Sequence, residues 1–322
     1  MVVLCLGAGR MGRGIAHAAA WAGHPVRLLD AKPRDPAGFA ALRDETLAEI
    51  GASVAMVAGM GGHPEAVEAV MARVTVWPAA EAAEAFAGAD IVFEAVPETM
   101  EAKRAAFAAF DAHAAPDAIL ASTTSTILST DLAALTAHPG RALNAHWLNP
   151  AFLVPLVEVS PNEATAEATL TRLEGWLEAI GKVPVRCKAS PGYIVPRIQA
   201  LAMNEAARLV EEGVATPEDV DRAVKYGFGL RFAILGLIEF IDWGGGDILY
   251  HASRELSEAL GSDRFAAPEI IARNMDEGRI GLKSGRGFYD YAGRDIPAYR
   301  RERLGAFLAA LTAAGLARPP AL

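Results

Sequence analysis

A glycine-rich turn near the start of the chain, GAGRMG at residues 7–12, is the feature that most constrains the fold. It follows a strand-like run and opens an Ala-rich helical stretch, the context in which this otherwise weak pattern is informative. Gly7 permits a tight turn, Gly9 lets the backbone approach a pyrophosphate, and Gly12 packs the helix against the sheet. The start of the helix also offers free N–H groups to phosphates. We expect the turn to bind a dinucleotide through Gly7, Gly9, Arg10, Met11 and Gly12.

An acidic residue, Asp30, ends the next strand-like run about 20 residues after the turn, where dinucleotide sites place the acid that binds a ribose. A carboxylate there accepts hydrogen bonds from the ribose hydroxyls and repels a 2′-phosphate, so the expected cofactor is NAD rather than NADP. Lys32 and Arg34 follow closely and weaken that preference. FAD binding and a purely structural glycine-rich turn are the alternatives to this interpretation.

The first part of the chain alternates short β-rich runs with helical stretches, which predicts a parallel sheet covered by helices on both faces. After residue 191 the sequence is helical. We therefore predict an α/β Rossmann-type domain over residues 1–188, followed by an all-α domain over residues 189–322. The junction is expected at Ser190–Pro191, a Pro–Gly break after the last strand. Further strands are expected at residues 74–77, 91–96, 118–123, 141–147, 154–161 and 181–187.

Composition narrows the class of protein and its partners. The net charge of −9 argues against nucleic acid or an anionic membrane as a partner, since both require a basic face. The most apolar run, residues 232–241, is too short to span a bilayer and contains Glu239. The chain starts with a strand-like run rather than a basic segment, so no signal peptide is expected. Cys5 and Cys187 lack a CxxC partner, which favours two buried, reduced thiols in a cytoplasmic protein without a metal site.

A histidine and a glutamate bracket the apolar segment HWLNPAFLVPLVE, residues 146–158. His146 ends a strand-like run, and ligands bind at the carboxyl ends of parallel strands in open α/β sheets. The next strand brings Glu158 alongside. A histidine held by a carboxylate is fixed in one tautomer and is a better base, which suits removal of a hydroxyl proton. Taken alone, such a pair is more often a structural salt bridge.

Several long motifs occur in one order along the chain, namely EAVPETMEAK, ASTTSTIL, HWLNPAFLVPLVE, SPGYIVPRI and GLKSGRGFYDY. With them, the sequence resembles the L-3-hydroxyacyl-CoA dehydrogenase family over nearly its whole length. The resemblance implies NAD-dependent oxidation of a secondary alcohol, with His146 as the base and Glu158 as its partner. It also implies an active site between the two domains and a homodimer formed through the helical domain.

The resemblance assigns roles to further residues. Ser125 would bind the substrate oxygen, and Asn149 would hold the geometry on the nicotinamide side. Glu98 and Lys103 would lie by the nicotinamide ribose. Lys283 would reach toward the cofactor, although a solvated lysine in a Gly-rich turn is an equal alternative.

The sequence departs from the family at positions that concern the substrate. Pro196 stands where the family usually has an asparagine facing the substrate. Residues 36–72 contain no lysine, and only Arg43 and Arg73 bear positive charge in or beside them, so the phosphates of CoA would find few partners.

A third departure concerns the segment GFGLRFAILG, residues 227–236. It resembles relatives of the L-gulonate dehydrogenase/lambda-crystallin and L-carnitine dehydrogenase branches, and Arg231 in it could bind a carboxylate. The alternative, that Arg231 forms an ion pair with Glu239 or Asp242 or is simply exposed, is as well supported as carboxylate binding. We lean to a small free hydroxy acid as substrate. An acyl-CoA thioester and a non-catalytic NAD-binding protein remain the alternatives.

Overall fold

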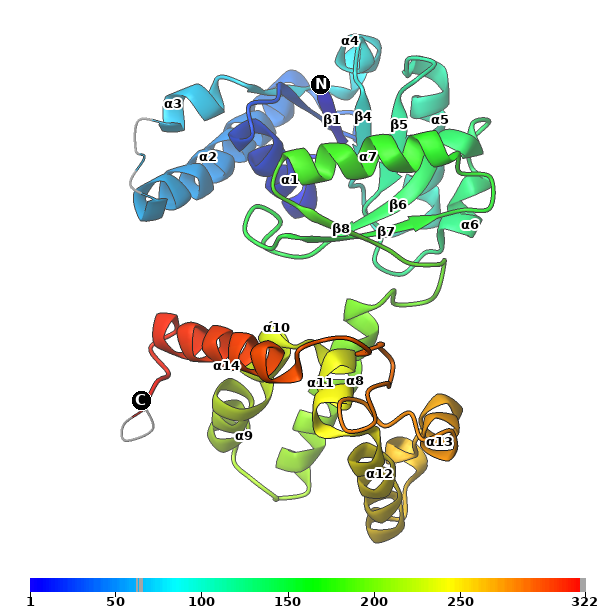
Figure 1. Ribbon diagram of the computed structural model, residues 1–322. Helices are drawn as coiled ribbons and strands as arrows, with labels where there is room; N and C mark the ends of the chain where they lie inside the picture. Colours follow the sequence, from blue (N-terminus) through cyan, green and yellow to red (C-terminus); the bar gives the residue numbers. More distant parts are fainter. Residues whose placement is uncertain (62, 64–65, 319–322) are drawn as a thin grey trace. The chain divides into compact units, whose positions relative to one another are not determined.

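The computed structural model describes residues 1–61, 63 and 66–318, which form two compact units (Figure 1). The first unit comprises Met1–Ala202 and the second begins at Met203. The division falls inside helix α8 (Val195–Glu211), later than the expected junction at Ser190–Pro191. The start of α8 is hydrogen-bonded to the sheet of the first unit through Glu158, which accounts for this placement.

An eight-stranded sheet forms the centre of the first unit, with the strand order β3-β2-β1-β4-β5-β6-β7-β8. Its order reverses at β1, which pairs with both β2 and β4, and this is where open α/β sheets bind dinucleotides. The expected Rossmann-type fold is therefore confirmed. The strands are β1 (Val3–Leu6), β2 (Val26–Leu29), β3 (Val74–Trp77), β4 (Ile91–Glu94), β5 (Ile119–Ser122), β6 (Ala142–Trp147), β7 (Leu156–Pro161) and β8 (Val183–Arg186).

The sheet differs from the expected parallel arrangement at one edge. Strand β7 pairs antiparallel with β6, whereas β7 and β8 are parallel to each other. The cause is the connection over residues 148–155, which is too short for a parallel pair. Parallel strands need a crossover of a dozen or more residues. This hairpin places residues of β6 and β7 directly opposite one another.

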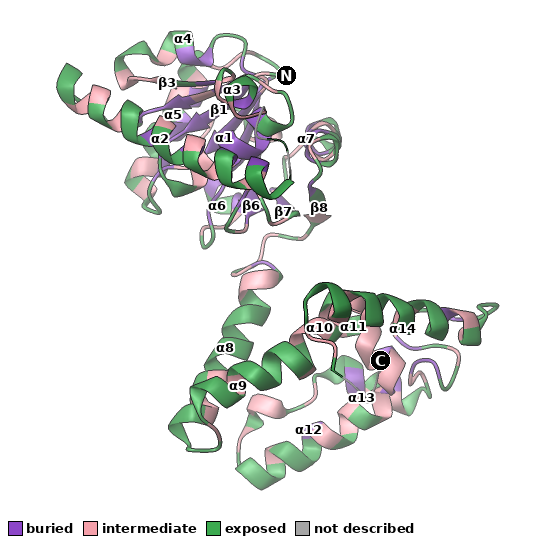
Figure 2. Cartoon of the chain, turned by 90° about the vertical axis from the view of Figure 1, so that its left-hand side faces the viewer, coloured by how far each residue is buried: buried purple, intermediate pink, exposed green. Residues whose placement is uncertain are grey.

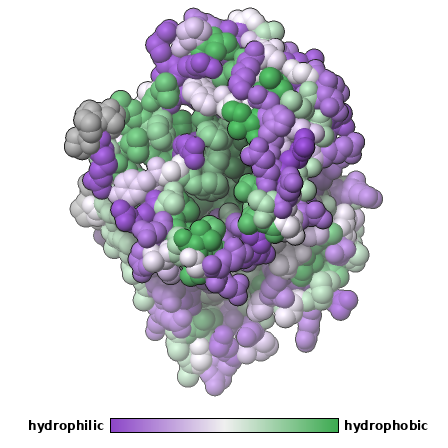
Figure 3. All heavy atoms as spheres, turned by 90° about the horizontal axis from the view of Figure 1, so that it is seen from below, coloured by the Kyte–Doolittle hydropathy of each residue, from purple (hydrophilic) through white to green (hydrophobic). Residues whose placement is uncertain are grey.

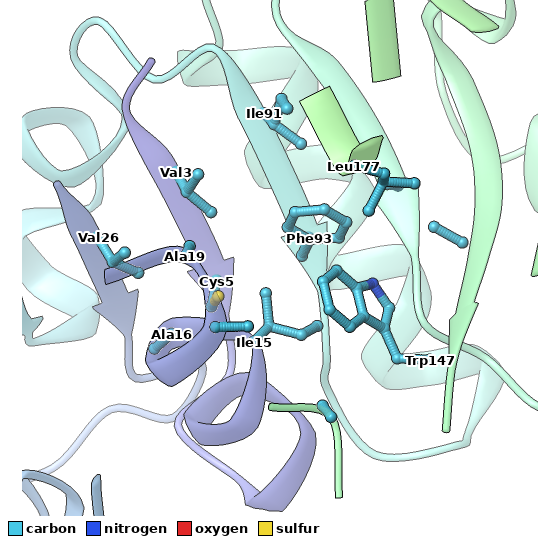
Figure 4. Close-up of a cluster of buried hydrophobic side chains, with 14 of the residues drawn as sticks. Val3, Cys5, Ile15, Ala16, Ala19, Val26, Ile91, Phe93, Trp147 and Leu177 are labelled. Atoms are coloured by element: carbon cyan, nitrogen blue, oxygen red, sulfur yellow. The ribbon is translucent and has the colours of Figure 1, made fainter. Parts of the chain in front are cut away.

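Helices cover both faces of the sheet and bury two separate apolar clusters. Val3 and Cys5 of β1 point into the cluster under α1, α2, α3 and α7, whereas Leu4 and Leu6 point into the cluster under α4, α5 and α6. In Figure 4 the side chains of the first cluster converge between the sheet and the helices. The helices are α1 (Arg10–Trp21), α2 (Pro36–Gly61), α3 (Ala66–Met71), α4 (Ala82–Phe86), α5 (Met100–His113), α6 (Ser129–Ala133) and α7 (Glu167–Ala179), with 3-10 turns at Ala79–Glu81 and Pro139–Arg141.

The two cysteines are not equivalent. Cys5 is fully buried in the first cluster, and this burial raises the pKa of its thiol to about 12. Cys187 follows β8 and is only partly buried, so the expectation of two buried thiols is correct for Cys5 alone. Both are free thiols.

The second unit is helical and buries few residues, as the scarcity of purple in this part of Figure 2 shows. One polar centre of this unit is Asp242, whose buried carboxylate accepts the N–H groups of Phe288 and Tyr289 and the hydroxyl of Tyr291. The GLKSGRGFYDY motif thus wraps around one carboxylate. The helices are α9 (Pro217–Ala223), a π-helical segment (Val224–Phe228), α10 (Gly229–Ile234), α11 (Leu237–Gly244), α12 (Gly246–Leu260), a 3-10 turn (Asp263–Phe265), α13 (Glu269–Asp276) and α14 (Ile296–Ala313). Within the described ranges, no helix has both the length and the apolar character needed to cross a membrane.

Candidate active site

His146 and Glu158 meet across the β6–β7 hairpin, where they are direct register partners. The Nδ1 atom of His146 lies 2.8 Å from Oε2 of Glu158. His146 is 4% exposed and Glu158 is completely buried, so little water competes for this contact. The antiparallel turn of the chain after β6 is thus what brings the histidine and the glutamate together.

The other ring nitrogen of His146 faces Ser125. The Oγ atom of Ser125 is 3.2 Å from Nε2 of His146, and Ser125 lies exposed on the loop after β5. Ser125, His146 and Glu158 therefore form one line of polar contacts that runs from an exposed hydroxyl to a buried carboxylate. This is the arrangement in which an oriented imidazole can exchange a proton with a bound molecule.

The second oxygen of Glu158 holds the start of helix α8. Oε1 accepts the backbone N–H groups of Ile194 and Val195, each at 2.8 Å. A carboxylate is stabilised at a helix N-terminus by the free N–H groups and the helix dipole. Pro196 is the second residue of α8, and proline is tolerated in a first turn because that turn needs no N–H donor from it.

Tyr193 is a part of this site that sequence reasoning did not single out, although it lies in the quoted SPGYIVPRI motif. Its ring stacks on the His146 imidazole, with centroids 4.9 Å apart and an interplanar angle of 11°. Its hydroxyl donates to the carbonyl oxygen of Thr124 and accepts from Nδ2 of Asn144, both at 2.9 Å. Burial raises the pKa of Tyr193, so this hydroxyl stays protonated and able to donate. Tyr193 is also non-glycine with a φ of 44°, a conformation that surrounding contacts must enforce.

Glu98 organises the loop that presents Ser125. Its Oε1 accepts the backbone N–H groups of Ser125 at 3.1 Å and Thr126 at 3.2 Å, and the hydroxyls of Thr124 and Thr126. The ammonium of Lys103 lies 3.1 Å from the other oxygen of Glu98. Glu98 thus positions a loop, a function that the sequence did not indicate.

Lys103 is 1% exposed and links Glu98 to a second, fully buried carboxylate. Its Nζ lies 2.9 Å from Glu94, which also accepts the N–H of Val96. An ammonium enclosed in this way is compensated by two acids. Lys103 therefore supports Glu98 and exposes almost no surface to a ribose.

Glu98 should make the stability of the fold depend on pH. Burial alone would raise its pKa, but hydrogen bonds from Thr124 and Thr126 and the charge of Lys103 outweigh burial and lower the pKa from 4.5 to about 2. A carboxyl group whose pKa is lower in the folded than in the unfolded chain stabilises the folded state when the pH is above the pKa of the unfolded chain. For Glu98 this contribution is lost as the pH falls from 4.5 toward 2.

We expect Glu98→Gln to lower the free energy of unfolding at pH 7, by less than the full pKa shift implies because water screens this partly exposed group. The deficit should shrink as the pH falls below 4.5. Urea unfolding at a series of pH values measures it. A deficit that stays constant down to pH 3 would show that the charge of Glu98 is not what stabilises the loop.

The glycine-rich turn has the geometry that a dinucleotide site requires. Gly7 has a φ of 109°, and a Cβ added there would lie 2.6 Å from the carbonyl oxygen of Ala95. A Cβ at Gly12 would lie 2.1 Å from the carbonyl oxygen of Gly7, so helix α1 can start this close to β1 only with glycine. Gly9 is the N-cap residue of α1 and faces open space, which leaves room for a phosphate.

Asp30 lies at the edge of the cavity next to this turn. The cavity has a volume of about 390 Å³ and is lined by Gly7, Gly9, Asp30 and Arg34, among others. Oδ1 of Asp30 accepts the N–H of Lys32 at 3.1 Å, and Oδ2 lies 2.6 Å from Nε of Arg34. Each carboxylate oxygen retains a free lone pair for a ribose hydroxyl. The residues present therefore fit a dinucleotide.

The remaining predicted residues are not part of the line of contacts from Ser125 to Glu158. Asn149 is exposed and lines a second cavity of the first unit together with Arg10. Arg231 and Lys283 belong to the second unit. Arg231 is exposed, donates to the carbonyl of Gly227 and lies 5.0 Å above the Phe240 ring, whereas Lys283 pairs with Asp247 at 3.1 Å.

The suggested acidic partners of Arg231 are engaged elsewhere. Glu239 pairs with Arg303 at 3.1 Å and with the hydroxyl of Tyr299, and Asp242 holds the closing motif. An ion pair of Arg231 with either acid is therefore wrong for the described residues. No group of three metal-ligating side chains is found among these residues either.

Comparison with known proteins decides the family. Residues 2–190 match the model for the NAD binding domain of 3-hydroxyacyl-CoA dehydrogenase, and residues 192–291 match the model for its C-terminal domain. The chain belongs to the 3-hydroxyacyl-CoA dehydrogenase family. Family membership makes it an NAD-dependent dehydrogenase that acts on a CH–OH group.

Relatives within the 3-hydroxyacyl-CoA dehydrogenase family differ in the substrates that their names give. The chain is 36% identical to a probable 3-hydroxybutyryl-CoA dehydrogenase of Bacillus subtilis, covering 90% of this chain and 96% of that protein. It is 34% identical to a 5-formyl-3-hydroxy-2-methylpyridine 4-carboxylate 5-dehydrogenase of Mesorhizobium japonicum, over 68% of this chain and 71% of that protein. The solved 3-hydroxyacyl-CoA dehydrogenase of Archaeoglobus fulgidus aligns with a TM-score of 0.75 and 32% identity, covering 98% of this chain and 100% of that one.

Proposed function

We propose that this protein oxidises the secondary alcohol of a 3-hydroxy carboxylic acid or its thioester, with a preference for a small free hydroxy acid. The observation that carries the proposal is the line of contacts from Ser125 through His146 to Glu158. It lies in a unit that also contains the glycine-rich turn and Asp30, which fit the cofactor. The line supplies a base and a hydroxyl, the two groups that alcohol oxidation needs from the protein.

In this proposal His146 takes the hydroxyl proton. An ionised carboxylate can only accept, so Glu158 would take the Nδ1–H of the imidazole, and the lone pair of Nε2 would then face Ser125. The substrate hydroxyl, held by the Ser125 Oγ, would give its proton to Nε2, and the buried Glu158 would stabilise the imidazolium formed. Bound NAD supplies the acceptor for the hydride. Gly7, Gly12 and Asp30 would hold that cofactor.

The preference for a free acid rests on charge. Residues 36–72 and their flank offer two cations, of which Arg43 pairs with Asp44 and Arg73 donates to the carbonyl of Ala20. Few cations are therefore left in this region to bind the phosphates of CoA. The relative from Mesorhizobium japonicum is named for a free carboxylate substrate, which is compatible with this preference.

The second candidate is an L-3-hydroxyacyl-CoA dehydrogenase, as the name of the Bacillus subtilis relative suggests. The two are distinguished by kcat/KM for NADH production with L-3-hydroxybutyryl-CoA, 3-hydroxybutyrate, L-gulonate and L-carnitine. A higher value for one of the free acids supports the proposal, and a strong preference for the thioester contradicts it. Turnover on none of them would favour a non-catalytic NAD-binding protein, against which the assembled dyad argues.

Asp30 provides a test of the cofactor site. Asp30→Ala removes the acceptor proposed for the ribose hydroxyls, so the KM for NAD should rise at least about tenfold, the effect expected for losing hydrogen bonds to a charged group. The KM for the alcohol substrate should change little. Steady-state kinetics with NAD varied at saturating substrate measures this. A KM for NAD equal to that of the wild type would rule out the ribose assignment.

Tyr193 is expected to act as a positioning residue. Tyr193→Phe keeps the stacked ring but removes the hydroxyl that ties Thr124 to Asn144, so kcat should fall about tenfold through misplacement of the Ser125 loop. Tyr193→Leu also removes the stacking on His146 and should lower kcat further.

The affinity for NADH reports whether Tyr193 acts through the dyad alone. It should remain unchanged in both Tyr193 variants, because Tyr193 contacts the dyad and not the glycine-rich turn. Fluorescence titration with NADH beside the kcat measurement separates the two effects. Equal losses of kcat and NADH affinity would point to a general loss of structure instead.

The apolar surface of helix α8 supports a homodimer. None of its residues is buried. Two of its large apolar side chains are strongly exposed, Leu201 at 66% and Met203 at 69%. The face drawn in Figure 3 is hollowed, and apolar residues line the hollow. Exposed apolar patches of this kind mark interaction sites. A sedimenting mass of two chains would support the homodimer, and a mass of one chain would contradict it.

A further inference from the structure

A second cavity of the first unit has no role in the site described so far. It has a volume of about 340 Å³ and lies between α1, α2 and the loop that follows β6. Its lining includes Arg10, Glu49, Ile50, Asn149 and Phe152. All of these residues belong to the same compact unit as the dyad.

Two arginines line this cavity, and only one of them is free to bind a ligand. Arg13 donates to the carbonyl of Ala8 at 2.8 Å and pairs with Glu45 at 3.0 Å and with Glu49. Arg10 is exposed, and its side chain makes no hydrogen bond or ion pair with any other residue that the structure describes. Arg13 shares its single charge between Glu45 and Glu49. Arg10 is therefore the guanidinium of this cavity whose hydrogen-bond donors have no partner among the described residues.

Apolar residues make up much of the remaining lining of the cavity. Phe152 stacks on His17, with ring centroids 4.4 Å apart, and Nδ1 of His17 lies 2.8 Å from Oγ of Ser53. Burial and, to a lesser degree, the charge of Lys182 lower the pKa of His17 to about 4, so its ring is neutral at physiological pH. With Ile50 and Phe152 in its lining, the cavity suits an anion that carries a short apolar body.

The lining of the cavity includes part of the segment that follows the proposed base. Asn149 is three residues after His146, and three residues of extended chain span at most about 11 Å. The exposed side chain of Asn149 has no hydrogen-bond partner among the described residues. An amide donor and a guanidinium thus line one cavity, and the amide belongs to the segment that joins His146 to Glu158.

We infer that this cavity binds the carboxylate of the substrate, with the Arg10 guanidinium as its anchor and the Asn149 amide as a second donor. The inference rests on the proposed function and specifies its substrate as a short free hydroxy acid. A guanidinium binds a carboxylate through two parallel hydrogen bonds, which fixes the orientation of the acid as well as its position. Arg10 would serve two ligands: its backbone lies in the dinucleotide turn, and its side chain reaches the substrate.

The test compares Arg10→Gln with Arg43→Gln, a matched loss of charge on α2 outside both cavities. Each variant is assayed with 3-hydroxybutyrate and with its uncharged methyl ester. We expect Arg10→Gln to raise the KM for the acid at least about tenfold, as expected for a lost charged hydrogen bond, and to change kcat/KM for the ester less than about twofold. The KM for NAD should be unchanged, and Arg43→Gln should behave as the wild type.

Three outcomes would overturn the inference. Equal losses with acid and ester would show that Arg10 does not recognise the carboxylate. A KM for NAD raised as much as that for the acid would make Arg10 a residue of the cofactor site. A loss confined to 3-hydroxybutyryl-CoA, and absent with its N-acetylcysteamine thioester, would mean that Arg10 binds the phosphates of CoA.

A binding experiment separates failure of this inference from failure of the proposed function. If the wild type turns over none of these alcohols, calorimetric titration of the NAD-saturated protein with 3-hydroxybutyrate still tests the cavity. Binding that is lost in Arg10→Gln and retained in Arg43→Gln supports the inference. Absent binding in the wild type, or equal binding in all three proteins, overturns it.

Discussion

His146→Ala is expected to lower kcat by about 10²- to 10⁴-fold, the range over which a positioned general base accelerates proton transfer. The imidazole is the group between the exposed Ser125 hydroxyl and the buried Glu158 carboxylate, and alanine leaves no acceptor for the hydroxyl proton. NADH should bind nearly as tightly as to the wild type, because His146 does not line the cavity at the glycine-rich turn. Steady-state kinetics and fluorescence titration with NADH measure the two quantities.

The matched control for this prediction is His138→Ala, which removes an exposed histidine from the same unit and should leave kcat unchanged. The proposed role of His146 would be contradicted if His146→Ala lost NADH affinity in proportion to kcat. In that case the histidine would be a structural member of the hairpin, as an isolated His–Glu contact often is.

Glu158→Gln is expected to lower kcat by about 10³- to 10⁴-fold while leaving the protein folded. The amide oxygen can still accept from the N–H groups of Ile194 and Val195, which preserves the start of α8. The amide nitrogen, however, would donate to Nδ1 of His146 and move the imidazole proton to Nε2. The lone pair that faces Ser125 would then be lost.

The unfolding free energy distinguishes this effect from general damage. Glu158→Ala, which cannot accept from α8, should be destabilised by about 1–3 kcal/mol for a buried donor left without a partner. Glu158→Gln should be destabilised less than Glu158→Ala and yet be almost as inactive. If Glu158→Gln kept kcat within about tenfold of the wild type, the carboxylate would be a helix cap rather than part of a dyad.

The sequence was sufficient to predict the parts of the site that local motifs define. The GAGRMG turn, Asp30 after β2 and the His146–Glu158 pair each follow from residues close in sequence and from the element that precedes them. The antiparallel hairpin was missed, although the short connection over residues 148–155 contained the signal. The alternation of strands and helices along the sequence does not by itself indicate the direction of each strand in the sheet.

Contacts between distant segments could not be predicted in this way. Tyr193 lies 69 positions from Thr124, and Glu98 lies 27 positions from Ser125. The resemblance to the family placed Glu98 and Lys103 near a ribose, but only the fold shows that Lys103 is enclosed by two carboxylates. The motif therefore singled out these residues without revealing what they contact.

Arg10 shows a related limit. A glycine-rich turn is recognised by what its backbone does, so the pattern says nothing of the side chain at its variable positions. The arginine at such a position becomes informative only beside a cavity whose other arginine is already paired. Arg231, by contrast, is conspicuous in the sequence alone, because it interrupts an apolar run.

Chemical rescue tests the central claim, that His146 takes the substrate proton, most directly. His146→Ala would be assayed for NADH production with the preferred alcohol of the wild type while imidazole is added. The account predicts that imidazole restores turnover with saturation, and more effectively at pH values where it is unprotonated, because it replaces the missing base. Normal NADH binding with no gain in turnover from imidazole or smaller amines would contradict the account.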